Sequence, residues 1–210
     1  MKIPKEIEKY ISNKSIPRYN ARLKSARYDD SPYPRICKAY EQAALEPASV
    51  DDVIKYTNEF LEKCGLKPIK CPRKDFPEGK PQGLKKFYDK IKDDYALTDR
   101  SDIVWMKFTE DGYLGAVAKG ADINFSIPSS RSDYKKTSDG KPKSKNNKWI
   151  YTNSGIIVHR LGKKWCRKYV LVFPLSGIPC NLNSKHIECG IGNYLIEKGV
   201  PILDYYSHRF

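Results

Sequence analysis

The sequence predicts an α+β protein: a helical N-terminal part, residues 1–92, followed by a mostly antiparallel β-sheet with a C-terminal helix packed on it, residues 99–210. Three observations lead to this prediction. Apolar residues recur at helical spacing before residue 92, short β-branched and aromatic runs separated by turn residues follow, and helical spacing returns near the C-terminus. The proline-rich stretch 67–83 is the best candidate for a linker or loop, and a single two-layer domain is the alternative to two domains.

One helix in the N-terminal part has signals at both of its ends. Ser49 is a favourable N-cap, acidic residues fill the first turn where the helix dipole favours negative charge, and Gly65 stands just past the end. The apolar stripe between them consists of Val53, Thr57, Phe60, Leu61 and Cys64. Weaker patterns of the same kind predict helices over residues 4–14, 33–46 and 84–92.

The middle of the chain has the patterns of strands. Residues 102–108 and 113–118 flank a Glu-Asp-Gly turn, and residues 123–127 alternate between apolar and polar with a period of two, so we expect an antiparallel meander. Two further runs, 149–161 and 165–175, lie on either side of Gly162 and predict a β-hairpin with a basic tip.

A C-terminal helix is expected after the longest apolar run, residues 169–175. Asn183 and Ser184 precede four apolar residues that share one helix face, namely Ile187, Ile191, Tyr194 and Leu195. Gly199 ends this helix, and residues 200–206 are apolar enough to return as a strand.

Length and composition indicate a globular protein without membrane spans. The 210 residues can bury a substantial core, and no run reaches the roughly 18 to 20 apolar residues that a membrane helix needs. The N-terminus carries charges where a signal peptide needs an apolar core. Six cysteines without a C-x-x-C pair are typical of reduced thiols. We therefore expect a cytoplasmic protein with no membrane partner and no disulfide scaffold.

The net charge is the strongest global signal. There are 39 Lys and Arg residues against 25 Asp and Glu residues, which gives a net charge of +14 and an isoelectric point of about 9.4. Such an excess attracts polyanions, and nucleic acid is the commonest polyanion in a cytoplasm. An AT-rich coding composition also enriches lysine without any ligand, but here the positive charge is clustered as well as global.

Two basic clusters predict a nucleic-acid interface. The first lies in a stretch with little apolar content and comprises Arg131, Lys135, Lys136, Lys141, Lys143, Lys145 and Lys148, followed by Trp149. The second is the predicted hairpin tip, with Arg160, Lys163, Lys164, Arg167 and Lys168. Basic side chains neutralise phosphates and release counterions, and aromatic side chains stack on bases. The alternative is a solvated loop whose charge only increases solubility. The sequence does not distinguish RNA from DNA.

A small nuclease or nucleotide-processing enzyme is the second functional hypothesis. His159, His186 and Glu188 are residue types that supply a base and an acid for metal-independent cleavage of a phosphodiester. Nothing in their spacing requires them to meet, so we expect a binding protein rather than an enzyme. A third hypothesis, a module that binds an acidic partner protein, predicts the same basic surface.

No metal or cofactor is expected. Cys180, His186 and Cys189 are residue types of a zinc site, but their irregular spacing disfavours zinc without excluding it. The carboxylates near residues 99–111 flank a strand and its turn, where acidic residues normally face water. No glycine-rich phosphate-binding motif occurs, which disfavours nucleotide-driven chemistry.

Overall fold

The computed structural model describes residues 3–11, 34–76, 82–97, 102–120, 144–145, 148–149 and 153–204, and these residues confirm the α+β class. Their elements, in chain order, are α1 (Lys5–Ile11), α3 (Pro34–Ala43), α4 (Val50–Lys63), β1 (Arg73–Asp75), α5 (Gln82–Tyr95), β2 (Ile103–Phe108), β3 (Leu114–Gly120), β4 (Ser144–Lys145), β5 (Lys148–Trp149), α7 (Asn153–Arg160), β6 (Tyr169–Pro174) and α8 (Ser184–Glu197). In the part of the chain that the structure describes, no helix is long and apolar enough to cross a bilayer.

Four strands form one antiparallel sheet in the order β1-β6-β2-β3. Met106 of β2 lies opposite Leu171 of β6 on one side and Val117 of β3 on the other. The apolar run forms β6, an interior strand that pairs with β1 and β2. Both faces of this strand are covered, as is typical of a continuous apolar run. The first two strands of the predicted meander are confirmed, and its third segment, 123–127, lies outside the described residues.

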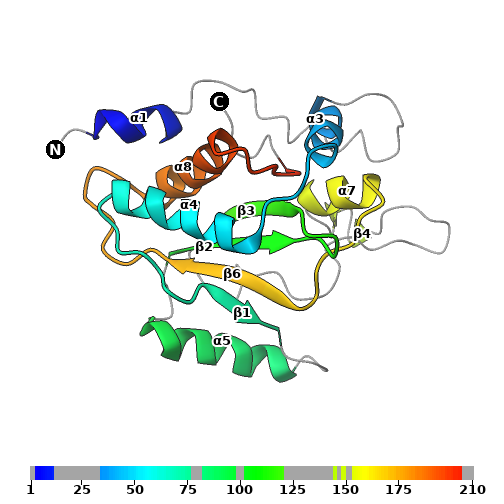
Figure 1. Cartoon of the computed structure of the whole chain (residues 1–210). Helices are drawn as coiled ribbons and strands as arrows, with labels where there is room; N and C mark the ends of the chain where they lie inside the picture. The colour runs from blue at the N-terminus through cyan, green and yellow to red at the C-terminus, as the bar shows by residue number, and fades with distance from the viewer. Residues whose placement is uncertain are drawn as a thin grey trace.

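Helices α1, α4 and α8 cover one face of the sheet (Figure 1). Val104, Met106 and Phe173 of the sheet join Phe60 of α4 and Ile191 of α8 in the largest hydrophobic cluster. The expected C-terminal helix is confirmed as α8, which begins after the N-cap Asn183 and is buried without interruption from residue 187 to residue 195. It is buried all round because α1 and α4 pack on it as well as the sheet.

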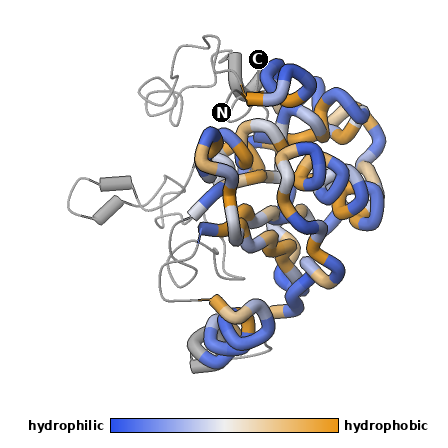
Figure 2. The backbone as a smooth tube through the Cα atoms, turned by 90° about the vertical axis from the view of Figure 1, so that its left-hand side faces the viewer, coloured by the Kyte–Doolittle hydropathy of each residue, from blue (hydrophilic) through white to orange (hydrophobic). Residues whose placement is uncertain are grey.

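Helix α5 covers part of the opposite face of the sheet (Figure 1). Phe87 and Ile91 of this helix pack with Phe76 and with Val170 and Val172 of β6. The helices are amphipathic, and Figure 2 shows hydrophobic and hydrophilic residues alternating along their turns. The centre of the sheet at β6 is therefore buried on both faces.

A smaller cluster joins α3 and α7 to the end of the sheet where β3 begins. It contains Ala39 of α3, Ile157 and Val158 of α7, Ala116 of β3, and Trp165. The Trp165 ring lies so close to Gly115 that a side chain at that position would overlap it.

The predicted hairpin formed by residues 149–161 and 165–175 is wrong. Residues 153–160 form helix α7, and β6 pairs with β1 and β2 instead. A short run of β-branched residues does not distinguish a buried strand from a buried helix. Here the helix forms, and it buries Ile157 and Val158 against β3. Gly162 ends this helix at a φ of +67° rather than turning a hairpin.

Two further segments differ in detail from the expectation. Arg73–Asp75, within the proline-rich stretch 67–83, forms the edge strand β1, which fits between Pro72 and Pro77 because an edge strand needs few ladder bonds. In the segment 200–206, Ile202 makes one isolated parallel bridge to Leu114, and residues 205–206 lie outside the described part of the chain.

Candidate functional site

The basic segment, residues 160–168, connects the end of α7 to the start of β6. Trp165 and Cys166 are buried and hold its centre against the protein. Three backbone hydrogen bonds run from Glu110 N to Lys164 O (2.9 Å), from Cys166 N to Phe108 O (2.8 Å) and from Phe76 N to Lys168 O (2.8 Å). The backbone of this segment is therefore fixed by β2, by the turn after it and by the residue that follows β1.

Three side chains of the basic segment are exposed: Lys164, Arg167 and Lys168. None of them forms an ion pair within the part of the chain that the structure describes. Arg73 of the neighbouring strand β1 is 52% exposed, and its guanidinium carbon lies 4.3 Å from the centroid of the Tyr169 ring. Arg73 also pairs with Asp75 at 3.0 Å. The exposed part of the basic segment thus continues onto the edge of the sheet.

The other two basic side chains of the segment, Lys163 and Arg160, are less exposed to solvent. Lys163 Nζ lies 2.5 Å from an Asp111 carboxylate oxygen and 3.9 Å from the centroid of the Tyr113 ring, and its side chain is only 15% exposed. Partial burial acts to raise the pKa of Asp111, but the hydrogen bond from Lys163 contributes to holding it below its usual value. Arg160 is half-buried, and its carbonyl accepts a hydrogen bond from the Tyr40 hydroxyl at 3.1 Å.

The first predicted basic cluster lies mostly outside the described residues, which include neither Arg131 nor Lys135, Lys136, Lys141 and Lys143. The described backbone of β4 and β5 forms a two-stranded antiparallel ladder, in which Lys145 lies opposite Lys148 and Ser144 lies opposite Trp149. Basic residues thus stand opposite each other in this small sheet.

The structure places the predicted acid–base residues on two helices. His186 is in the first turn of α8, where its backbone N–H donates to Asn183 Oδ1 at 2.9 Å, and Glu188 follows it on the same helix. Glu188 is 4% exposed and accepts a hydrogen bond from Lys185 Nζ at 2.6 Å. His159 lies on α7, at the opposite end of the sheet from the start of α8 (Figure 1). His186 and Glu188 are two positions apart on α8, a spacing that directs helical side chains to different faces, and His159 lies on another helix, so these three residues are not brought together as an acid–base site.

The cysteines and His186 near α8 are not gathered into a metal site. Cys180 is exposed in the loop before the helix, whereas Cys189 is buried within it. Among the residues that the structure describes, no three His, Cys, Asp or Glu side chains come together as metal ligands would.

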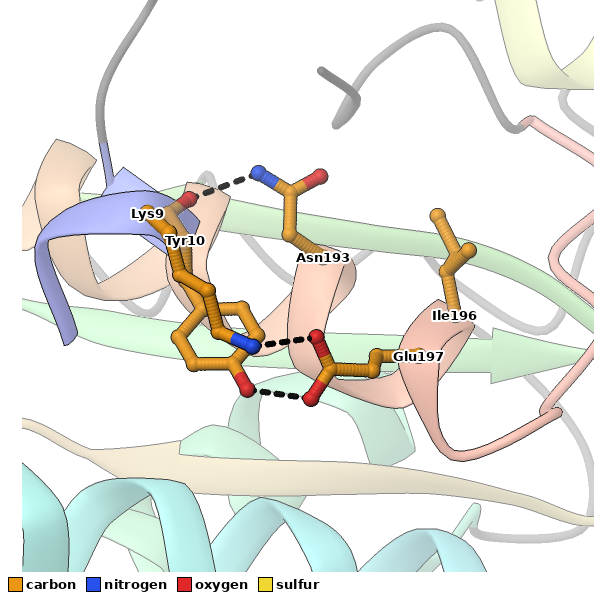
Figure 3. Close-up of a pocket in the computed structure, with 5 residues that line it drawn as sticks. All are labelled: Lys9, Tyr10, Asn193, Ile196 and Glu197. Atoms are coloured by element: carbon orange, nitrogen blue, oxygen red, sulfur yellow. Dashed lines mark hydrogen bonds and ion pairs between the residues drawn. The ribbon is translucent and has the colours of Figure 1, made fainter. Parts of the chain in front are cut away.

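A second feature is a cavity of about 410 Å³ between α1 and α8, lined by Lys9, Tyr10, Asn193, Ile196 and Glu197. Figure 3 shows the Lys9 ammonium and the Tyr10 hydroxyl both directed at the carboxylate of Glu197. The distance from Lys9 Nζ to Glu197 Oε2 is 2.7 Å. On the same helix, Asn193 Nδ2 donates to the backbone oxygen of Tyr10 at 2.6 Å. These contacts attach α1 to α8.

The polar groups at this cavity have shifted pKa values with clear causes. The hydrogen bond from Lys9 holds the pKa of Glu197 below its usual value, and the same bond raises the pKa of Lys9. Burial raises the pKa of the Tyr10 hydroxyl, and its hydrogen bond to Glu197 acts in the same direction. At neutral pH the carboxylate is charged, and each of its oxygens already has a partner.

Sequence reasoning did not identify two of these residues. Arg73 lies in a proline-rich stretch about 90 positions away from the basic segment, so only the pairing of β1 with β6 brings them together. The sequence gives only a weak indication that Asn193 is important. It is an amide between the apolar residues Ile191 and Tyr194 in a helix that the sequence predicts to be buried. An amide at such a position must find a partner, but the sequence does not reveal which one.

Comparisons with protein-family models, with curated proteins and with solved structures find no match for this chain.

Proposed function

We propose that the protein binds nucleic acid through the basic segment, with Lys164, Arg167 and Lys168 contacting phosphates. The observation that carries this proposal is the exposure of three basic side chains within five residues, none of them in an ion pair with a described residue. An unpaired ammonium or guanidinium group can neutralise a phosphate without first losing an acidic partner. The net charge of +14 adds a long-range attraction for any polyanion.

The rigid attachment of the basic segment supports the same proposal. Its backbone bonds to Phe108, Glu110 and Phe76 mean that binding does not have to order a mobile loop. Arg73, which lies over Tyr169, extends the positive surface onto β1. In this proposal the lysine-rich stretch that includes Lys145, Lys148 and Trp149 supplies further phosphate and base contacts.

The test measures the affinity of the full chain for fluorescent single- and double-stranded RNA and DNA of about 20 nucleotides. The salt concentration is varied from about 50 to about 300 mM NaCl, a range over which phosphate contacts change the affinity strongly. The variant reverses the three exposed charges: Lys164→Glu, Arg167→Glu and Lys168→Glu. We expect at least a tenfold loss of affinity at low salt. We also expect the slope of log K against log salt on single strands to become shallower by about 2, because roughly 0.7 counterions are released per phosphate contact.

A matched control separates the basic segment from the net charge. Lys55, Lys67 and Lys70 are exposed and lie outside the segment, and their reversal to Glu removes the same charge. Each reversal changes the charge by −2, so both triple variants carry +8 instead of +14. An equal loss of affinity in the two variants would show that the segment has no special role.

Two further measurements on the same binding samples distinguish the alternative functions. Cleavage of the labelled strands, followed on a denaturing gel with and without EDTA, would replace the binding proposal with a nuclease. Binding of fluorescent polyglutamate in the absence of nucleic-acid binding would favour an acidic protein partner.

A further inference from the structure

Arg73 and Tyr169 form a stacked pair beside the basic segment. The guanidinium carbon of Arg73 lies 4.3 Å from the centroid of the Tyr169 ring, a distance typical of a cation held over an aromatic face. Arg73 Nε also donates to Asp75 Oδ1 at 3.0 Å. The guanidinium group is therefore held by a ring on one of its faces and by a carboxylate at one of its edges.

Much of the Arg73 side chain remains open to solvent. It is 52% exposed, although the guanidinium group lies over the ring of Tyr169. β1 is an edge strand, so no further strand of the described chain covers this side of the sheet. Among the described residues, hydrogen bonds from the Arg73 side chain involve Nε alone. A planar group in this position can offer its outer face to a ligand.

The pairing of β1 with β6 places the stacked pair next to the basic segment. Asp75 lies opposite Tyr169 in the register of these strands, and Phe76 N donates to Lys168 O at 2.8 Å. The two strands lie side by side in Figure 1, and neighbouring strands are about 4.8 Å apart. A nucleic acid whose phosphates contact the basic segment can therefore bring a base to Arg73.

A supported guanidinium plane is suited to an unpaired base. Unpaired bases stack on arginine guanidinium planes as well as on aromatic rings, whereas the bases of a duplex present only their edges in the grooves. Trp165, the aromatic residue within the basic segment, is buried and cannot stack on a base. Arg73 on Tyr169 thus adds to the basic segment a stacking surface that the segment itself lacks.

We infer that an unpaired nucleic-acid base stacks on the outer face of the Arg73 guanidinium group, which then lies between the base and the Tyr169 ring. The inference rests on the proposed nucleic-acid binding by the basic segment, and it names the class of ligand as a single strand. A duplex is limited to contacts with the segment, because its bases are already stacked on one another.

The variant Arg73→Lys tests the inference, because lysine keeps the positive charge and removes the planar group. Arg73 is a surface residue, so the variant should fold. Fluorescence anisotropy measures the affinity of the variant and of the unmodified full chain for three probes of about 20 nucleotides. The probes are a single DNA strand, its duplex, and a strand of abasic deoxyribose phosphates, which has the same phosphates as the first probe and no bases.

The unmodified chain should bind the single strand at least about fivefold more tightly than the abasic strand, since stacking of one base contributes at least that factor. Arg73→Lys should weaken binding of the single strand by a similar factor and should change binding of the other two probes less than about twofold. Equal affinities of the unmodified chain for the single and abasic strands would overturn the inference. So would a loss in the variant that is equal for all three probes, or no loss for the single strand.

The charge reversal of the basic segment separates a failure of this inference from a failure of the proposed function. Lys164→Glu, Arg167→Glu and Lys168→Glu together should weaken binding of all three probes. If they do so while Arg73→Lys has no selective effect on the single strand, phosphate binding stands and the stacking inference is wrong. If the unmodified chain binds no probe, or the reversal acts no more strongly than the control reversal outside the segment, the proposed function fails and the inference fails with it.

Discussion

At the residue scale, Gly190 shows how closely α8 packs against its neighbours. A Cβ atom at this position would overlap the Phe60 ring of α4 and would lie 3.0 Å from Ile11 Cγ2 of α1. Three helices therefore meet at a position where only a hydrogen atom fits. The glycine lowers the helix propensity of α8, and close packing of the three helices offsets this loss.

Replacing Gly190 with alanine should destabilise the protein. Overpacking costs about 1–3 kcal/mol, and the better helix propensity of alanine returns up to about 1 kcal/mol, so we expect a net loss of about 1–2 kcal/mol in the free energy of unfolding. Urea denaturation measures it. The control is the double variant with Phe60→Leu, in which the smaller side chain should make the combined cost less than the sum of the single costs. A Gly190→Ala variant at least as stable as the original chain would contradict the close contact.

Glu197 gives the attachment of α1 a pH dependence with a definite sign. Its pKa in the folded protein is lower than its usual value of 4.5. A lowered carboxyl pKa stabilises the folded state above pH 4.5, and this stabilisation is lost as the pH falls through the folded pKa. The effect should be small, because the two charged side chains are about half exposed.

The variant Glu197→Gln isolates this contribution. The difference in unfolding free energy between the original chain and the variant should be largest at about pH 7. It should shrink towards zero at about pH 3, because a carboxyl group with a lowered pKa becomes protonated over this range. Carboxyl NMR titration should give a Glu197 pKa below 4.5 that rises when Lys9 is replaced by Met. A stability difference that does not change with pH would argue against the ion pair.

At the element scale, α4, α7 and α8 all end at a glycine with positive φ: Gly65, Gly162 and Gly199. In α7 the N–H groups of Gly162 and Lys163 bond to the carbonyls of His159 and Val158, both at 3.0 Å. This is the Schellman arrangement, which satisfies the last carbonyls of a helix and turns the chain away. At Gly162 it directs the chain into the basic segment.

Gly162→Ala should lower the free energy of unfolding by about 1–2 kcal/mol, the cost of a left-handed conformation for a residue with a Cβ atom. Nothing lies within 4 Å of a Cβ atom at this position, so the cost is conformational and not steric. Gly162→Asn should cost less, because asparagine tolerates this conformation better. Thermal unfolding of the two variants checks the order. Equal stability of the alanine variant and the original chain would contradict the positive φ.

The sequence predicts those elements whose signals are local. Ser49 and Gly65 bound α4 in the structure as they do in the sequence, and Asn183 and Gly199 do the same for α8. Helix α7 was not predictable, because Ile156, Ile157 and Val158 favour a strand locally and the helix is selected by tertiary contacts with α3 and β3. The cavity between α1 and α8 could not be predicted from the sequence either, because it depends on a tertiary contact between Tyr10 and Asn193, which are 183 positions apart.

At the scale of the whole molecule, the N-terminal and C-terminal parts share their core. The main cluster combines Ile7 of α1 and Phe60 of α4 with Leu171 of β6 and Ile187 of α8, and β1 hydrogen-bonds to β6. Separating the chain between residues 92 and 99 would expose apolar surface on both faces of the sheet.

A fragment of residues 99–210 is therefore expected not to fold on its own, and the full chain is expected to unfold in one cooperative transition. Near-ultraviolet circular dichroism and the dispersion of amide NMR signals measure folding of the fragment. The full chain, purified in the same way, is the control. A folded fragment with its own cooperative transition would show that residues 99–210 are an independent domain.

The anchoring of the basic segment would allow the proposed nucleic-acid binding to change in evolution independently of the stability of the fold. Buried Trp165 and Cys166 and main-chain bonds hold its shape, whereas the side chains at 164, 167 and 168 extend into solvent. Surface substitutions of this kind usually change stability by less than about 0.5 kcal/mol. Mutation can therefore alter charge and hydrogen-bonding groups at these three positions while the scaffold persists, and such mutations need no compensating changes in the core.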